Sequence, residues 1–139
     1  MCGLGAFVAT VEKLKQHNVV PYIWQFGQQL IDEANRLIQQ HQLQEHIQFD
    51  GIPCSPFYLT YDCDKAVSME YRTLFSQEMI KQGVLMPWLA LSYAHGSAEL
   101  DKTLSALEHT LKVYRQALEQ GIQAYLDGDS IKPVFRKYN

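Results

Sequence analysis

The chain has 139 residues, of which 47% are hydrophobic and 19% charged, so it is long enough for one compact domain and too apolar for a disordered polymer. Its formal net charge of −3 argues against non-specific binding to nucleic acid, which needs a basic surface. The sequence has no run of about 18 apolar residues and no signal-peptide pattern at its start. We therefore expect a cytoplasmic protein with neither a membrane span nor a nucleic-acid partner.

Two helices are predicted in the first 40 residues. Apolar side chains recur at helical spacing from Leu4 to Leu14, and a second amphipathic pattern runs from Val19 to Gln40. Pro21 lies in the first turn of the second helix, where a missing N–H is tolerated. The first 40 residues thus predict two successive helices.

The pattern then changes to a period of two. Apolar residues alternate with polar ones around residues 47–49 and again at 57–61, which predicts two strands. Asp50-Gly51 is typical of a turn, and Pro53 and Pro56 are expected between the strands.

Helical spacing returns in residues 68–82, and Gly83 is well placed to end that helix. Two more short strands are predicted, at residues 84–86 and 89–94. Two strands would thus follow the third helix, as two precede it.

A long helix is predicted for residues 97–120, with Ser97 as its N-cap and Gly121 as its break. Its leucine stripe from Leu100 to Leu118 fits a coiled-coil seam or a helix lying on a sheet, and we favour the second because the strands need a cover. The sequence thus predicts one α+β domain over residues 1–139, with a small, mostly antiparallel sheet covered by helices on one face.

The residues alone indicate no self-contained active site. Cys2, Cys54 and Cys63 form no even or closely spaced set, which favours free thiols in a reducing compartment. His41 and His46 have no evident partners as metal ligands, and no glycine-rich phosphate loop follows a strand. We therefore predict no metal site and no catalytic residue within this chain.

The stretch from Ser92 to Ser97 is the strongest candidate for a binding edge. It lies between a predicted strand and a predicted helix, where backbone N–H groups can hold an anion. The competing interpretation, which we favour, is that Ser97 caps the helix and His95 satisfies a backbone group. Trp88 fits either a pocket lining or the core.

Several stretches of the chain, in the same order, resemble the C-terminal domain of class III pyridoxal-phosphate (PLP) aminotransferases, in particular the glutamate-1-semialdehyde aminomutase branch. The resemblance rests on the helix and following strand at residues 74–87, on Ser92-Tyr93-Ala94-His95 with the helix start at 99–104, on residues 4–14 and 51–54, and on the ending at 132–136. Residues 1–17 are similar to the helix that joins this domain to the large PLP domain.

The resemblance implies that the chemistry belongs to a missing part of the protein. In that family a lysine of the large domain forms the Schiff base with PLP. The lysines at positions 13, 15, 65, 81, 102 and 112 lie in or beside helical patterns, and none matches that motif. We therefore expect no PLP binding and no activity from this chain alone, a large domain in the same polypeptide, and a homodimeric parent.

One departure concerns the substrate. The aminomutases carry a glutamate before the Ser-x-x-His motif, whereas residues 86–91 here contain no acid. An aminotransferase acting on another amine, such as a sugar precursor, is an equally good expectation. The resemblance places Trp88, Ser92 and His95 at the edge of the substrate pocket.

Two other hypotheses compete with this one. A stand-alone regulatory or oligomerisation module could keep the fold and use the stripe from Leu100 to Leu118 as its interface. A small independent enzyme could use Cys54 or His95, although neither has a visible partner. If the chain is a fragment, surface once covered by a large domain is exposed, and we expect self-association.

Overall fold

The computed structural model of the chain describes residues 2–132, except for the side chain of Cys2. The elements follow in the order α1 (Cys2–Gln16), α2 (Val19–Gln40), β1 (Ile47–Ile52), β2 (Ser55–Thr60), α3 (Met69–Lys81), α4 (Ser97–Gln120) and the 3₁₀ turn η1 (Ile122–Ala124). The predicted α+β class is confirmed, and all four predicted helices form.

The sheet is one antiparallel hairpin, in which Ile47 pairs with Thr60 and Ile52 with Ser55. Buried and exposed side chains alternate along both strands, so one face lies on the core. The predicted turn at Asp50-Gly51 is wrong, because both residues lie in β1 and the chain reverses at Pro53-Cys54. Pro56 likewise lies inside β2 rather than between the strands.

Side chains occupy the outer edges of this hairpin. The Asn35 amide on α2 donates to the Phe49 carbonyl at 2.7 Å and accepts the Phe49 N–H at 3.1 Å. On the other edge, an Arg72 guanidinium nitrogen lies 3.4 Å from the Tyr58 carbonyl, and the Ser68 N–H donates to the Thr60 carbonyl. These groups are therefore not free to pair with a further strand.

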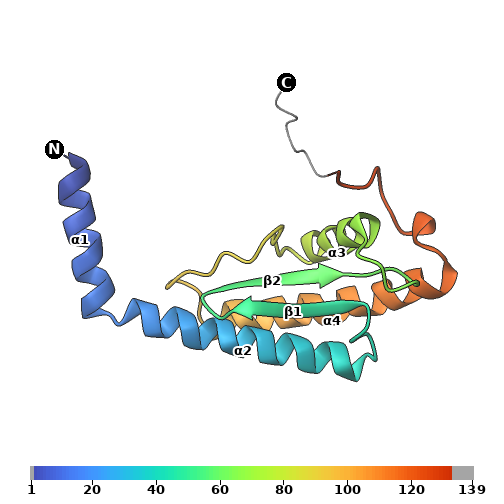
Figure 1. Cartoon of the computed structure of the whole chain (residues 1–139), viewed down its shortest axis with the longest axis horizontal. Helices are drawn as coiled ribbons and strands as arrows, with labels where there is room; N and C mark the ends of the chain where they lie inside the picture. The colour runs from blue at the N-terminus through green and yellow to red at the C-terminus, as the bar shows by residue number, and fades with distance from the viewer. Residues whose placement is uncertain (1, 133–139) are drawn as a thin grey trace.

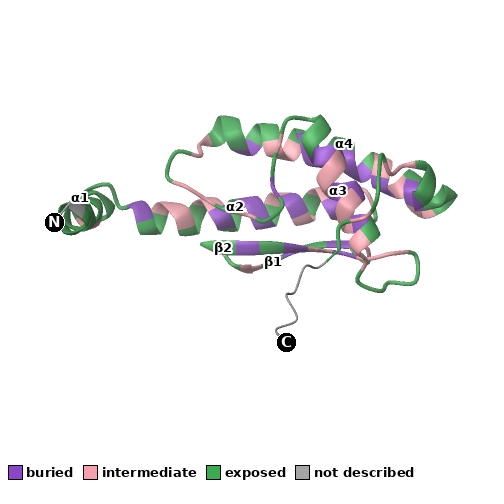
Figure 2. Ribbon diagram, turned by 90° about the horizontal axis from the view of Figure 1, so that it is seen from above, coloured by how far each residue is buried: buried purple, intermediate pink, exposed green. Residues whose placement is uncertain are grey.

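Helices pack around one face of the hairpin. Figure 1 shows α2 and α3 on either side of the strands and α4 behind them, and Figure 2 shows the buried residues gathered between these elements. The core includes Ala34, Ile38, Phe49, Tyr58, Leu74, Phe75, Met79, Leu107, Leu111 and Tyr114. The predicted cover of helices over a small antiparallel sheet is thus confirmed.

The leucine stripe of α4 belongs to this core. Leu100, Leu107 and Leu111 are buried, and the Tyr114 hydroxyl donates to the carbonyls of Tyr61 at 2.7 Å and His46 at 3.1 Å. Burial raises the pKa of that phenol well above its ordinary range. The buried part of the stripe therefore packs in the chain's own core, against α2 and α3, and does not form a coiled-coil seam.

The segment between α3 and α4, residues 83–95, contains no strand, so the strands predicted at 84–86 and 89–94 are wrong. Its carbonyls bond to side chains instead: the Tyr58 hydroxyl donates to Met86 O at 3.1 Å, and Arg72 donates to Pro87 O at 2.8 Å. Pro87 also has no N–H to offer a neighbouring strand.

The start of α4 also differs from the prediction. Gly96, rather than Ser97, is the N-cap residue, and the Glu99 carboxylate accepts the Gly96 N–H at 2.8 Å. Ser97 is the first helical residue. At the other end, the predicted break at Gly121 is confirmed, with φ of 92°.

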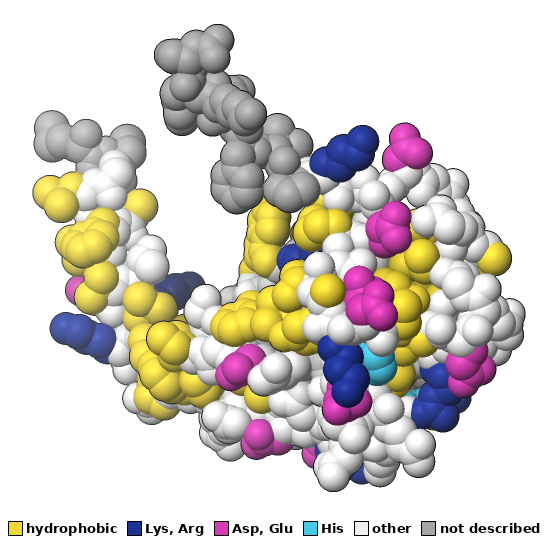
Figure 3. Space-filling view, turned by 45° about the vertical axis from the view of Figure 1, so that its right-hand side comes forward, with side chains coloured by type: hydrophobic (Ala, Val, Ile, Leu, Met, Phe, Trp, Pro, Cys, Tyr) yellow, Lys and Arg dark blue, Asp and Glu magenta, His cyan; other side chains and the backbone are white. Residues whose placement is uncertain are grey.

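Helix α1 projects from the body of the molecule (Figure 1). Its junction with α2 is Asn18, which adopts the left-handed conformation with φ of 49° and makes no side-chain capping bond. Leu4, Phe7 and Val8 are exposed, and Figure 3 shows the hydrophobic surface along this helix.

Candidate functional site

A hollow of about 500 Å³ lies between α2, the 83–95 segment and the first turns of α4. Its apolar walls include Phe26 and Leu30 from α2 and Leu100 from α4, and its polar side chains are His95, Glu99, Lys102 and Thr103. Two of the three predicted pocket-edge residues, Trp88 and His95, line this hollow, whereas Ser92 does not. The segment that carries these residues is held in place at several points along its length.

Gly27 on α2 lets Leu91, which lines the hollow, pack closely against this helix. A Cβ atom at this position would lie 1.7 Å from the Pro53 carbonyl oxygen and 2.7 Å from Leu91 Cδ1. Only glycine therefore lets α2, the hairpin turn and the 83–95 segment meet at this point. A glycine inside a predicted helix was the one sequence signal of this close approach.

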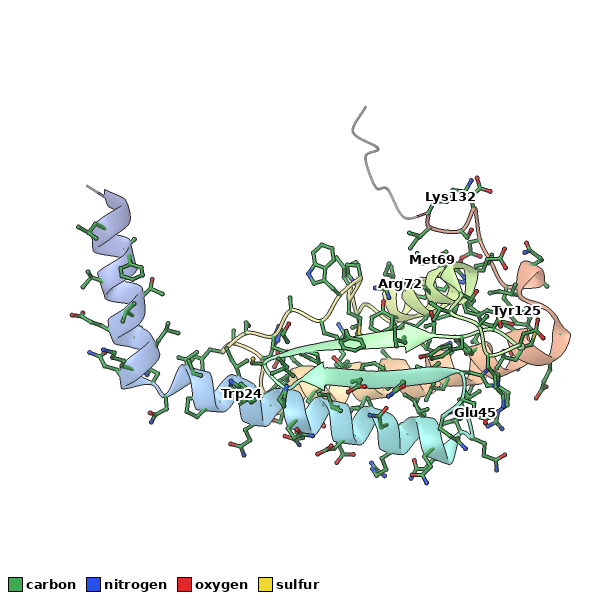
Figure 4. The ribbon with its side chains drawn as sticks, viewed as in Figure 1. Trp24, Glu45, Met69, Arg72, Tyr125 and Lys132 are labelled. Carbon is green, nitrogen blue, oxygen red and sulfur yellow. The ribbon has the colours of Figure 1, made fainter. Side chains whose placement is uncertain are left out.

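The 83–95 segment is also anchored to α3, through Arg72. Arg72 lies beside the 83–95 segment in Figure 4, and besides its bond to Pro87 it stacks over the Tyr58 ring, with 4.7 Å from its Cζ atom to the ring centroid. Trp88 comes directly after this anchor and is 72% exposed. An aromatic side chain is thus presented to solvent at the mouth of the hollow.

His95 is held by one bond to its ring and one to its carbonyl. Its Nδ1 accepts the Ser92 N–H at 3.3 Å, and the Tyr22 hydroxyl donates to the His95 carbonyl. The interpretation that His95 satisfies a backbone group is confirmed. In the neutral ring the proton therefore lies on Nε2, which is a hydrogen-bond donor.

Two opposite charges lie at the α4 end of the hollow. Glu99 accepts the Gly96 N–H, and this bond lowers the pKa of its carboxyl below the usual range. Lys102 lies near Gly83, where an added Cβ would be 3.3 Å from Nζ. Sequence reasoning did not select either residue, because the predicted strands concealed that residues 83–91 and α4 form one hollow.

The other candidates do not gather into a site. Within the part of the chain that the structure describes, no group of three or more His, Cys, Asp or Glu side chains is placed to hold a metal ion. Cys54 and Cys63 are exposed free thiols. Among residues 2–132, no helix combines the length and apolar character that a membrane span requires.

Comparison with known proteins gives a partial match. No family model matches the chain, and no solved structure does. The chain is 30% identical over 80 residues to glutamate-1-semialdehyde 2,1-aminomutase 2 of Bacillus mycoides, which covers 50% of this chain and 19% of the relative. The same figures hold for aminomutase 1 of Bacillus cereus strain G9842.

A third relative, glutamate-1-semialdehyde 2,1-aminomutase 1 of Listeria welshimeri, is 32% identical over 62 residues, or 41% of this chain and 14% of its own length. The matches therefore span about a fifth or less of the relatives. The C-terminal part of the proposed resemblance, residues 133–136, lies outside the described residues. Half of this chain is thus similar to part of a glutamate-1-semialdehyde 2,1-aminomutase.

Proposed function

We propose that the chain is the small C-terminal domain of a class III, PLP-dependent aminotransferase or aminomutase, and that it closes over the cofactor site of a large domain in the same polypeptide. The observation that carries this proposal is the 30% identity to aminomutases over 80 residues, which amount to 19% of the relative's length. A segment of that extent is the size of one small domain.

The residues of this chain do not fit PLP by themselves. The cofactor needs a lysine that can form a Schiff base in a site shielded from water. Every described lysine is exposed, including Lys102, the lysine that lines the hollow. This exposure supports our proposal that the Schiff-base lysine belongs to the large domain and that this chain alone is inactive.

Exposed apolar side chains support contact with a further domain. Leu4 and Phe7 on α1, together with Leu85 and Trp88, are all more than half exposed. Leu4 and Phe7 are one turn apart on α1, and neighbouring exposed apolar side chains of this kind are typical of surfaces that a partner covers. In the whole protein, α1 would be the connecting helix, and Trp88, Ser92 and His95 would lie toward the substrate.

The substrate of the parent is proposed to differ from glutamate semialdehyde. The wall formed by residues 86–91 carries no carboxylate, and Leu89 and Leu91 line the hollow. We propose as the substrate of the parent another amine, such as a sugar precursor. We further propose a homodimeric parent that acts in the cytoplasm.

An immunoblot of source-cell lysate with an antibody against this chain tests the proposal. The expected band is roughly three times the 16.0 kDa of this chain, as for a large catalytic domain plus a small one. A band at 16.0 kDa would overturn the proposal and favour a stand-alone module instead.

A second measurement locates the cofactor. Borohydride reduction of the full protein after incubation with PLP should label one lysine, and peptide mapping should place it outside these 139 residues. The isolated chain, treated in the same way, is the control and should carry no stoichiometric label. Stoichiometric labelling of Lys102 in the isolated chain would contradict a site in the large domain.

A further inference from the structure

The hollow beside α4 has a clear division between an apolar part and a polar part. Its apolar part is built by Phe26, Leu30, Val84, Leu89, Leu91 and Leu100, with Trp88 beside them. Its polar part lies on the side of His95 and the first two turns of α4. A volume of about 500 Å³ is in the range of small-molecule sites.

Most polar groups at that end already have partners within the chain. The Glu99 carboxylate accepts the Gly96 N–H, and the Thr103 hydroxyl donates to the Glu99 carbonyl at 2.7 Å. His95 Nδ1 accepts the Ser92 N–H, so in the neutral ring Nε2–H is the donor. The Gly96 and Ser92 N–H groups are thus satisfied within the chain, and the side-chain donors that line the hollow are His95 Nε2–H and the Lys102 ammonium.

Lys102 is the main unoccupied donor. Within residues 2–132, no carboxylate lies within 4.0 Å of its Nζ atom, although Lys81 and Lys112 on the same body both have such partners. Its Nζ atom would lie 3.3 Å from a Cβ atom added at Gly83, so the ammonium is close to the Gly83 backbone. An apolar hollow with an unpaired cation at one end is complementary to an amphipathic anion.

We propose that this hollow is a binding site for a small carboxylate that carries an aromatic or aliphatic body. Lys102, with His95 Nε2–H as a second donor, holds the carboxylate, while Trp88, Phe26 and Leu89 contact the body. Binding at this site uses only residues of this chain and does not depend on the reaction of a parent enzyme.

The competing ligand chemistry is an amine, which would choose Glu99 instead of Lys102. Both side chains are exposed, but Glu99 already accepts the Gly96 N–H, whereas Lys102 has no carboxylate partner among residues 2–132, so we expect Lys102 to decide the preference. An exposed ion pair changes affinity only about two- to five-fold. The dissociation constant of a small probe is expected at about 1 mM.

Fluorescence of Trp88 is a direct measure of binding. The chain has two tryptophans, so the Trp24→Phe variant leaves Trp88 as the sole reporter, and circular dichroism checks its fold. Three probes that carry a phenyl group at the end of a four-carbon chain are compared: 4-phenylbutyrate, 4-phenylbutanol and 4-phenylbutylamine. We expect 4-phenylbutyrate to bind two- to five-fold more tightly than the alcohol, with the amine weakest.

Lys102→Gln should remove the preference for the carboxylate while leaving binding of the alcohol unchanged. Lys112→Gln, an exposed lysine on the same helix that lies outside the hollow, is the matched control and should keep the preference. Amide shifts of Gly83 in the labelled wild-type chain give a second readout that needs no substitution.

Equal affinity for the three probes, or tightest binding of the amine, would overturn the proposal. So would a titration in which neither the Trp88 fluorescence nor the Gly83 amide shift changes. A native protein of 16.0 kDa would contradict the aminotransferase assignment but would leave this binding result standing. The two proposals therefore fail independently.

Discussion

Helices α1 and α4 have similar apolar stripes in sequence and opposite fates in the structure. Leu111 on α4 is 0% exposed and contributes to the core, whereas Leu4 on α1 is 72% exposed. Helical periodicity shows which face of a helix is apolar, but it does not show whether the same chain supplies a partner for that face. The stripe of α4 stabilises this domain, and that of α1 is available for another surface.

The largest expected effect tests this difference directly. Leu111→Ala should lower the free energy of unfolding by about 2–5 kcal/mol, because it leaves a cavity in the core. Leu4→Ala should change it by less than about 0.5 kcal/mol, because the side chain is already in water. Urea unfolding followed by circular dichroism measures both, and similar losses would show that α1 is part of the cooperative core.

A pair of glycines extends the comparison to the backbone. Gly27→Ala should cost about 1–3 kcal/mol, because the new methyl group would overlap the Pro53 carbonyl. Gly5→Ala on α1 meets nothing within 4 Å and should be neutral or stabilising by up to about 1 kcal/mol. The midpoint of thermal unfolding should therefore fall for Gly27→Ala and stay the same or rise for Gly5→Ala. An unchanged midpoint for Gly27→Ala would disprove the close approach.

Asn35 tests how the edge of the sheet is protected. Asn35→Ala removes both bonds to Phe49 and should cost about 1–2 kcal/mol. The exposed strand edge should also increase aggregation on heating, since it becomes free to pair. Light scattering during a thermal ramp checks this, with Gln39→Ala, an exposed residue on the same helix, as the control.

The smallest expected effect concerns pH. The Gly96 N–H lowers the pKa of Glu99 in the folded chain, so the charged carboxylate favours the fold at neutral pH. This contribution is present above the ordinary glutamate pKa of about 4.3 and is lost as the pH falls through the lowered folded value. The stability difference between the wild type and Glu99→Gln should therefore shrink below pH 4, and a difference that does not change with pH would contradict it.

Much of the architecture could be predicted from the sequence. The four helices and the hairpin follow from their apolar periods, and the break at Gly121 from its missing side chain. The strands expected at 84–86 and 89–94 could not be corrected from sequence, because short apolar runs fit a strand equally well whether or not a partner strand is free. Asn35 and Arg72 occupy the hairpin edges, and only the tertiary structure shows these contacts.

The candidate site could likewise be predicted only in part from the sequence. The sequence selected Trp88 and His95, which line the hollow, and also Ser92, which does not. Phe26 on α2 is far along the chain from Glu99 and Lys102 on α4, and none of the three was selected.

The sequence by itself determined the helices, the hairpin, the apolar faces and the similarity to part of an aminomutase, because these depend on local spacing and on residue identity. Only the tertiary structure decided that the stripe of α4 is buried while that of α1 is exposed, and that residues 83–95 form one wall of a hollow. The physical reason is that burial depends on which surfaces of the folded chain remain free to pair.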